Sequence, residues 1–214
     1  MKRSFLIIMA IICVNLGMAQ NPDKAKALLD DVYNKVKSYE NIYVDFKYAL
    51  TNLDAGTNDE TRGHVTMQGD KYLANFFGAQ QLFDGDKVYT IVPENEEVTI
   101  EDKSEDENTI TPSKMLTFYR QGHTYAWDIL QNIQGRKIQF IKLIPMDSNT
   151  EIKSILLGID AQTKHIYKVI QTGENGTMTT ITVNSFKTNQ PLSKTLFTFD
   201  ENNYKDDGYY IIRN

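Results

Sequence analysis

The chain has 214 residues, of which 41% are hydrophobic and 24% charged, proportions that are ordinary for a soluble globular protein with a sizeable core. Its formal net charge is −5, from 28 acidic and 23 basic side chains. Because phosphate contacts need clustered Lys and Arg, this acidic balance argues against nucleic acid as a partner. One domain is the simplest organisation for this length.

The first twenty residues differ in composition from the rest. Lys2 and Arg3 precede an apolar run over residues 5–16, and a small-x-small cleavage signal follows at residues 17–19. The pattern predicts a secretory signal peptide, residues 1–19, cleaved after Ala19. A transmembrane anchor is the alternative, but the run is shorter than the roughly 18 apolar residues that an anchor needs. Residues 20–214 are then expected as one exported domain with a net charge of −7, because cleavage removes two basic side chains.

The single cysteine, Cys13, lies inside this apolar run. A lipid-anchored protein would need a cysteine just after a small residue at the cleavage point, whereas Ile11 and Ile12 precede Cys13. The mature protein is therefore expected to have no lipid anchor, no disulfide and no thiol chemistry.

The mature chain begins with a strong helix signal. Asn21 or Asp23 can cap the helix and Pro22 suits its first turn. Apolar residues then recur at helical spacing, and they are Ala25, Leu28, Leu29, Val32 and Val36. From residue 42 the pattern changes to strict alternation, which predicts a strand over residues 42–50 with Val44, Phe46 and Tyr48 on one face.

Compact polar turns divide most of the remaining chain into a series of strands, which indicates one antiparallel meander. Two segments interrupt it. Residues 101–108 form an acidic run, and residues 111–120, beginning near Pro112, fit a short helix that contains Met115, Leu116 and Phe118. These three side chains either fill the core or cover an open face of the sheet.

The strand expected at residues 87–92 raises a question, because it is apolar on both faces. Val88, Thr90 and Val92 share one face, while Tyr89 and Ile91 share the other. An antiparallel sheet usually leaves one face to water. Some other part of the molecule, or a ligand, must therefore cover the second face.

Catalytic and metal-binding patterns are nearly absent from the sequence. His64, His123 and His165 lack the spacing of a zinc site, and they are interpreted as surface or hydrogen-bonded histidines. Asp84 and Asp86 flank a glycine, which suits a tight hairpin, although a carboxylate pair also permits hydrolysis with a water molecule. The acidic run lacks the order of a calcium loop. We expect no enzyme activity, no cofactor and no metal.

The order of these elements resembles the LolA type of periplasmic outer-membrane lipoprotein carriers. The resemblance extends over most of the mature chain: a helix leading into "VKSYENIYVDFKYAL", then "GHVTMQGDKYLANF", "QLFDGDKVYTIVPENEEVTI" and finally "LSKTLFTFD". It implies an α+β fold that is mainly β, namely an incomplete, strongly curved antiparallel β-barrel with a helical lid over an apolar cavity.

In this family the cavity holds the acyl chains of lipoproteins, so the resemblance implies a soluble chaperone that carries them from the inner to the outer membrane. The implied partners are acylated lipoproteins, an inner-membrane lipoprotein export complex as donor and a possible outer-membrane acceptor, with the carrier as a monomer. The expected cavity and lid residues are Leu28, Leu29, Val32, Phe46, Tyr48, Tyr89, Ile91, Met115, Leu116, Phe118 and Trp127. Tyr89 and Ile91 are assigned to the cavity face because a large aromatic suits a broad, adaptable surface, and Trp127 fits either the cavity or an ordinary core.

One departure from the family pattern affects the lid. Family members have an Arg-Pro pair after the strand that begins here at Gly63, and the arginine latches the lid. This chain has Gln68, Gly69 and Asp70 in that region. Lid closure is therefore expected to depend on apolar packing. A domain of the same fold that senses lipids or lipoproteins to regulate the envelope stress response remains the main alternative, and a periplasmic hydrolase is a second one.

Overall fold

The computed structural model describes residues 21–104 and 111–214, and these residues form a mainly β fold with a few helices. The helices are α1 (Pro22–Lys37), α2 (Pro112–Met115) and α3 (Glu201–Asp206), with short 3-10 turns η1 (Pro93–Asn95) and η2 (Phe118–Arg120). The strands are β1 (Ile42–Asn52), β2 (Thr57–Gln68), β3 (Lys71–Phe76), β4 (Ala79–Phe83), β5 (Lys87–Val92), β6 (Glu97–Asp102), β7 (His123–Ile133), β8 (Arg136–Pro145), β9 (Ile152–Asp160), β10 (Ile166–Gly173), β11 (Met178–Thr188) and β12 (Tyr210–Arg213).

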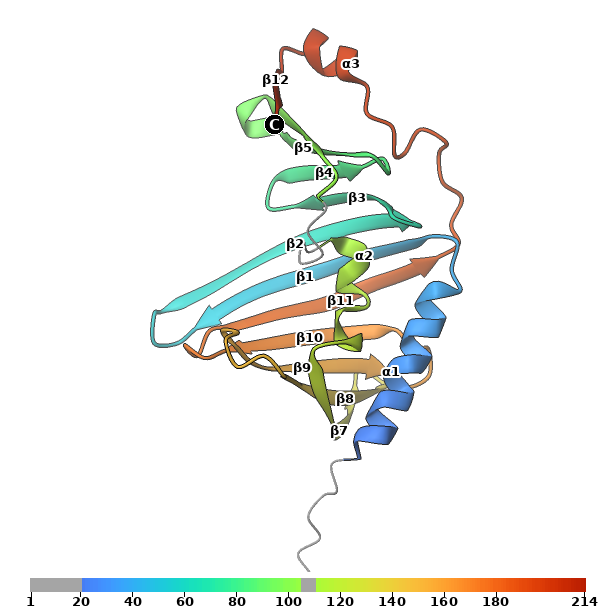
Figure 1. The fold of residues 1–214 in the computed structure, drawn as a ribbon, viewed down its shortest axis with the longest axis vertical. Helices are drawn as coiled ribbons and strands as arrows, with labels where there is room; N and C mark the ends of the chain where they lie inside the picture. Colours follow the sequence, from blue (N-terminus) through green and yellow to red (C-terminus); the bar gives the residue numbers. More distant parts are fainter. Residues whose placement is uncertain (1–20, 105–110) are drawn as a thin grey trace, which may run out of the picture.

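Within the described residues the strands form one open, curled sheet of twelve, in the order β12-β6-β5-β4-β3-β2-β1-β11-β10-β9-β8-β7 (Figure 1). Neighbouring strands pair antiparallel, as expected, with one exception. β12 runs parallel to β6, because the chain returns to this edge from β11 in the middle of the sheet instead of through a hairpin. The expected mainly β fold with helices is confirmed, and the expectation of a purely antiparallel sheet is wrong at this edge.

The sheet consists of two meanders that meet in its middle. β1 to β6 follow one another toward one edge, and β7 to β11 return from the other edge until β11 lies beside β1. These two central strands pair from Ile42 with Thr188 to Thr51 with Met178. Because β6 and β7 are consecutive in the chain but lie toward opposite edges, the segment between them has to cross one face of the sheet.

The face that this segment crosses is the inner face of the sheet, and the opposite face is the outer face. α2 and η2 belong to the crossing segment, and α2 contacts β2 and β3 (Figure 1). α1 lies on the inner face too, against β7 and η2. The helical elements that precede β8 are thus gathered on the inner face, apart from the single turn η1.

α1 forms where its sequence signals place it. Asn21 caps the helix, because its Oδ1 accepts a hydrogen bond of 2.9 Å from the backbone N–H of Lys24, and Pro22 occupies the first turn. The apolar stripe faces the sheet, and its buried members are Ala25, Leu28, Leu29, Val32 and Val36. The predicted helix and its buried stripe are confirmed. They form the main core together with inward-facing residues such as Ile141 and Leu157.

The C-terminal segment covers part of the outer face. After β11 the chain runs along the edge of the molecule to α3 and β12, beside β6 (Figure 1). Phe199 stacks on Tyr89 with ring centroids 4.3 Å apart, and Tyr204 stacks on Phe199 at 5.1 Å. These rings cover a second, smaller core whose buried residues are Leu82, Tyr89, Ile91, Val98 and Ile100. The second apolar face of β5 is therefore covered by the protein's own C-terminal segment.

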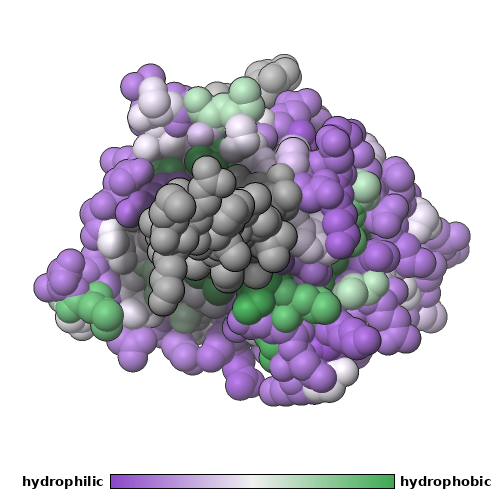
Figure 2. Space-filling view, turned by 90° about the horizontal axis from the view of Figure 1, so that it is seen from below, coloured by the Kyte–Doolittle hydropathy of each residue, from purple (hydrophilic) through white to green (hydrophobic). Residues whose placement is uncertain are grey.

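The surface is mostly hydrophilic at the end of the molecule where β7 and β8 lie, and separate green hydrophobic patches interrupt it (Figure 2). Exposed hydrophobic residues on these two strands include Ile129, Leu130 and Ile144. Among the described residues, no helix has the length and hydrophobicity required to cross a membrane.

Replacing Phe199 tests the role of the C-terminal segment. We expect Phe199→Ala to lower the free energy of unfolding by about 2–4 kcal/mol, because it removes the ring that covers Tyr89 and leaves a cavity. Tyr210→Ala is the matched control in the same segment, since Tyr210 is 77% exposed and its loss should cost less than about 0.5 kcal/mol. Urea unfolding followed by circular dichroism measures both values. Equal effects of the two substitutions would contradict the covering role.

Candidate functional site

The inner face contains an apolar pocket of about 410 Å³ between the sheet and α2. Inward-facing residues of β1, β2, β10 and β11 form its floor, and Pro112, Met115 and Leu116 form the wall on the α2 side. Among the described residues that line this apolar pocket, none is charged. The floor residues include Val44, Phe46, Tyr48, Val65, Met67, Val169, Ile181, Val183 and Phe186.

A second pocket of about 640 Å³ adjoins the apolar pocket and shares Met115, Val169 and Ile181 with it. This adjoining pocket lies between α1, η2 and β9–β11, and its wall includes Phe118 and Ile155. A methylene group occupies about the volume of a water molecule, roughly 30 Å³, so the two pockets together hold an acyl chain of on the order of 15 carbons or more. The arrangement suits a long, flexible, apolar ligand.

Close packing at Gly63 shapes the floor of the apolar pocket. A Cβ atom at Gly63 would lie 2.7 Å from Cζ of Phe46 and 2.8 Å from the backbone oxygen of Asn75. Glycine therefore permits the ring of Phe46 to lie flat across β2, with Phe76 beside it at 5.4 Å between centroids. Gly63 is the first residue of the stretch "GHVTMQGDKYLANF", which resembles the family. The close approach of Phe46 and Asn75 explains why a glycine is needed there.

The structure brings together some of the residues that the sequence nominates for the site. Phe46, Tyr48, Met115 and Leu116 line the apolar pocket, and Phe118 lines the adjoining pocket. The α1 residues of the nominated set lie outside both pockets, in the permanent core, with exposures of 7% or less: Leu28, Leu29 and Val32.

Trp127 also lies outside both pockets. Its side chain is half-buried on β7 and packs against the main core, with the ammonium group of Lys24 positioned 4.0 Å above its ring. The Lys24 contact places Trp127 at the N-terminal end of α1. Of the two interpretations open at the sequence level, the structure favours the core.

Tyr89 and Ile91 were assigned to the wrong face. Thr90, which lies between them in the strand, lines the apolar pocket, so alternation turns Tyr89 and Ile91 to the outer face. The physical reason is that the large ring of Tyr89 stacks on the ring of Phe199, from the C-terminal segment, and does not line a ligand pocket. Tyr89 also donates a hydrogen bond of 2.9 Å to Oδ2 of Asp84.

Residues of β10 and β11 were missed by the sequence reasoning. Val169, Ile181 and Val183 form a large part of the pocket floor. Ile181 and Val183 alternate with Thr180 and Thr182, a pattern that predicts a strand with one apolar face. Alternation alone does not say which face is inward, and only the pairing of β11 with β1 places Val183 next to Phe46.

The carboxylate pair at Asp84 and Asp86 is part of a turn. Oδ1 of Asp84 accepts hydrogen bonds from the backbone N–H groups of Asp86 and Lys87 at 2.8 and 2.9 Å. Partial burial raises the pKa of Asp84, but these two bonds and the Tyr89 hydroxyl outweigh it and lower the pKa below its usual value. Asp84 thus stays ionised, and its two oxygens accept the hydrogen bonds of the turn and of Tyr89. This supports a structural role for Asp84 in the hairpin.

The three histidines have hydrogen-bonding partners. His165 Nε2 lies 2.7 Å from the hydroxyl of Tyr39, and burial lowers the pKa of His165. His123 Nδ1 lies 2.7 Å from the backbone oxygen of Gln121. Within the described ranges, no three side chains of the His, Cys, Asp and Glu types gather as a metal site would require.

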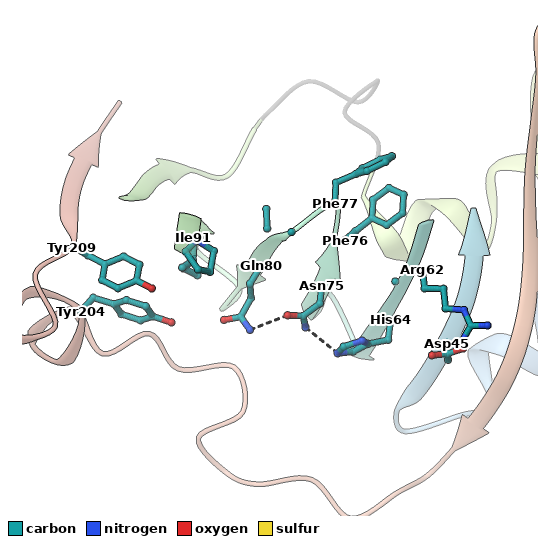
Figure 3. Close-up of a pocket in the computed structure, with 14 residues that line it drawn as sticks. Asp45, Arg62, His64, Asn75, Phe76, Phe77, Gln80, Ile91, Tyr204 and Tyr209 are labelled. Carbon is teal, nitrogen blue, oxygen red and sulfur yellow. Dashed lines mark hydrogen bonds between the residues drawn. The ribbon is translucent and has the colours of Figure 1, made fainter. Parts of the chain in front are cut away.

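A third pocket, of about 440 Å³, lies on the outer face and is polar (Figure 3). Its side chains bond to one another, since Gln80 Nε2 donates to Asn75 Oδ1 at 3.2 Å and Asn75 Nδ2 lies 3.0 Å from His64 Nε2. Asp45 and Arg62 are part of its wall (Figure 3). An acyl chain would strip water from these groups at a cost, so the outer pocket does not suit such a ligand.

Comparison with known proteins identifies the family of this chain. Residues 79–200 match the family model described as outer membrane lipoprotein carrier protein LolA. The match spans more than half of the chain, so the chain belongs to the LolA family, and the resemblance inferred from its sequence is confirmed. Among curated proteins, none matches the sequence.

Solved structures share the fold at low sequence identity. An uncharacterized conserved protein from Thermus thermophilus is 8% identical with a TM-score of 0.59, and the match covers 89% of this chain and 99% of the other. LprF from Mycobacterium bovis is 13% identical with a TM-score of 0.51, and the match covers 80% and 95%.

Two tyrosines, Tyr119 in η2 and Tyr125 on β7, provide a test of how the end of the crossing segment is anchored. The side chain of Tyr119 is fully buried, and its hydroxyl has no hydrogen-bonding partner among the described residues, so burial raises its pKa. We expect Tyr119→Phe to raise the free energy of unfolding by about 1–3 kcal/mol, because it removes an unpaired buried polar group.

Tyr125→Phe is the matched control, with an expected effect of opposite sign. The hydroxyl of Tyr125 donates to the backbone oxygens of Tyr119 and Arg120 at 2.8 and 3.1 Å, so its removal should cost about 1 kcal/mol. Thermal and urea unfolding measure both variants. A loss of stability in Tyr119→Phe would show that its hydroxyl is paired in solution.

Proposed function

We propose that the mature chain, residues 20–214, is a periplasmic carrier that binds the acyl chains of lipoproteins in the apolar pocket and takes them from the inner to the outer membrane. The observation that carries this proposal is the uncharged lining of the pocket on the inner face, in a chain that belongs to the LolA family. Residues 1–19 would direct export and be removed.

α2 is the part of the inner-face cover that we expect to move when a ligand enters. It has only four residues, which is too short for a stable helix without tertiary contacts. Met115 is 44% exposed although it forms part of the pocket wall. α1, in contrast, has a fully buried stripe in the main core. Lifting α1 would expose that stripe to water, so α1 would stay in place while α2 acts as the lid.

The arginine that latches the lid in the family has no counterpart at residues 68–70 of this chain. Gln68, Gly69 and Asp70 lie exposed at the tight connection between β2 and β3, where Gly69 has a φ of +59°. Closure would then depend on the packing of Met115 and Leu116 against the floor. Such a lid competes directly with the acyl chain for the same surface.

Because the lid and the acyl chain compete for the pocket floor, closure of the lid would favour release of the ligand. Burying an acyl chain of about 15 methylenes at ~0.8 kcal/mol each would contribute roughly 12 kcal/mol, which corresponds to nanomolar affinity or tighter. A lid that closes on the empty floor recovers part of this free energy. Transfer then requires a donor that holds the acyl chains less tightly and an acceptor that holds them more tightly. An inner-membrane lipoprotein export complex and an outer-membrane acceptor are the proposed partners of this monomer.

A pair of neighbouring residues on β11 tests the pocket. Val183 lines the apolar pocket, whereas Thr182 points to the outer face between Lys47 and Lys168, its partners in register. We expect Val183→Glu to reduce lipoprotein release about tenfold or more, because a buried acyl chain would strip water from the carboxylate. Thr182→Glu introduces the same charge outside the pocket and should behave as wild type.

The measurement uses spheroplasts that contain radiolabelled palmitoyl lipoproteins, incubated with the purified mature protein and energised. Soluble lipoprotein complexes are counted after centrifugation, and thermal unfolding confirms that both variants are folded. A folded Val183→Glu protein with full release would place the site elsewhere. If wild-type protein releases no lipoprotein and instead co-purifies with a transmembrane regulator, the sensing alternative would replace the carrier.

A further inference from the structure

The charged residues around the apolar pocket are unevenly distributed. The adjoining pocket is lined by Lys37, Lys114 and Arg120, and by His123, and no carboxylate appears among the described residues of its wall. The whole chain, in contrast, has an excess of acidic groups, with a net charge of −5. Positive charge is thus concentrated in one of two adjoining pockets, while the lining of the other is uncharged among the described residues.

Among the described residues, two of these cations have no carboxylate partner. In the described ranges, neither Lys37 nor Arg120 has a carboxylate oxygen within 4.0 Å. The nearby carboxylates on α1 are engaged elsewhere, since Asp30 pairs with Lys26 at 2.6 Å and Asp31 lies 4.0 Å from Lys164. The positive charge at this end is therefore not neutralised by α1.

An aromatic ring positions both cations. The guanidinium of Arg120 lies 3.8 Å from the centroid of the Tyr33 ring, and the ammonium of Lys37 lies 6.0 Å from it. Tyr33 is itself part of the wall of the adjoining pocket. Stacking on the ring leaves the edge of the guanidinium free, and its N–H groups match the spacing of two oxygens of a phosphate.

We propose that the cavity takes acyl lipids with a phosphate group at the polar end, in addition to the acyl chains of lipoproteins. The chain would occupy the apolar pocket and pass Met115, Val169 and Ile181, and the phosphate would lie between Arg120 and Lys37. This inference rests on the proposed function, because it needs the apolar pocket to bind an acyl chain. The proposed site needs both an acyl chain and a phosphate on the same ligand, and this requirement distinguishes it from a site for free phosphate.

Two ligands that differ only in the phosphate test this proposal. Monomyristoylglycerol and its phosphate ester, myristoyl lysophosphatidic acid, are titrated separately against mature protein loaded with the neutral fluorescent probe N-phenylnaphthylamine. We expect the phosphate ester to displace the probe with an affinity about tenfold higher or more, and this preference to weaken at high salt because the cations lie near solvent. Inorganic phosphate alone should displace no probe.

Substitutions test whether Lys37 and Arg120 cause the preference for the phosphate ester. In the double variant Lys37→Gln with Arg120→Gln, the affinity for monomyristoylglycerol should stay unchanged while the advantage of the phosphate ester falls to about twofold or less. Lys187→Gln is the matched control, since Lys187 is exposed on β11 near Tyr43, a residue that lines neither inner pocket. It should keep the full advantage.

The outcomes separate this inference from the proposed function. Equal affinity of wild-type protein for the two lipids would overturn the phosphate site and leave acyl-chain binding intact. A double variant that retains the preference would overturn the assignment to Lys37 and Arg120. Failure of both lipids to displace the probe would overturn acyl-chain binding itself, and the phosphate site with it.

Discussion

One topological constraint governs the candidate site: β6 and β7 follow each other in the chain but lie toward opposite edges of the sheet. The segment between them has to cross a face of the sheet, and it carries α2 and η2 over the strands as it does so. Met115 and Leu116 thereby become one wall of the apolar pocket, and Arg120 reaches the adjoining pocket. A single connection thus supplies the cover, the pocket wall and a cation.

The outer face of the same sheet also has apolar residues that need a cover. A curled sheet with apolar residues on both faces needs two covers, and the chain provides the second one after β11. Phe199 and Tyr204 stack in sequence on Tyr89, which makes this cover a permanent aromatic contact and not an exchangeable one. The outer face is therefore closed by protein at β5, and the apolar space that remains open lies on the inner face.

This division explains which predictions from the sequence succeeded. The spacing from Ala25 to Val36 identified α1 and its buried stripe, and alternation identified β1 with Phe46 and Tyr48 on one face, because both signals are local. The face of Tyr89 was assigned wrongly, since it depends on Phe199, which lies more than a hundred residues away. Val183 was missed for a similar reason, because strand pairing and not local pattern places it in the pocket.

The two inner-face helices differ in how strongly the sheet holds them, and this difference decides which one can act as a lid. α1 has sixteen residues, a capped N-terminus and a stripe in the main core, so its displacement would expose several fully buried side chains at once. α2 has four residues and no buried member, and its main contacts are with β2 and β3. Tyr119 in η2, four residues beyond the end of α2, is fully buried and fixes the far end of the segment. Under the proposed function, an acyl chain would displace this short, weakly held helix, which lies between a fixed end and the pocket floor, without unfolding the core. A carrier that must both bind and release its ligand would require such a lid.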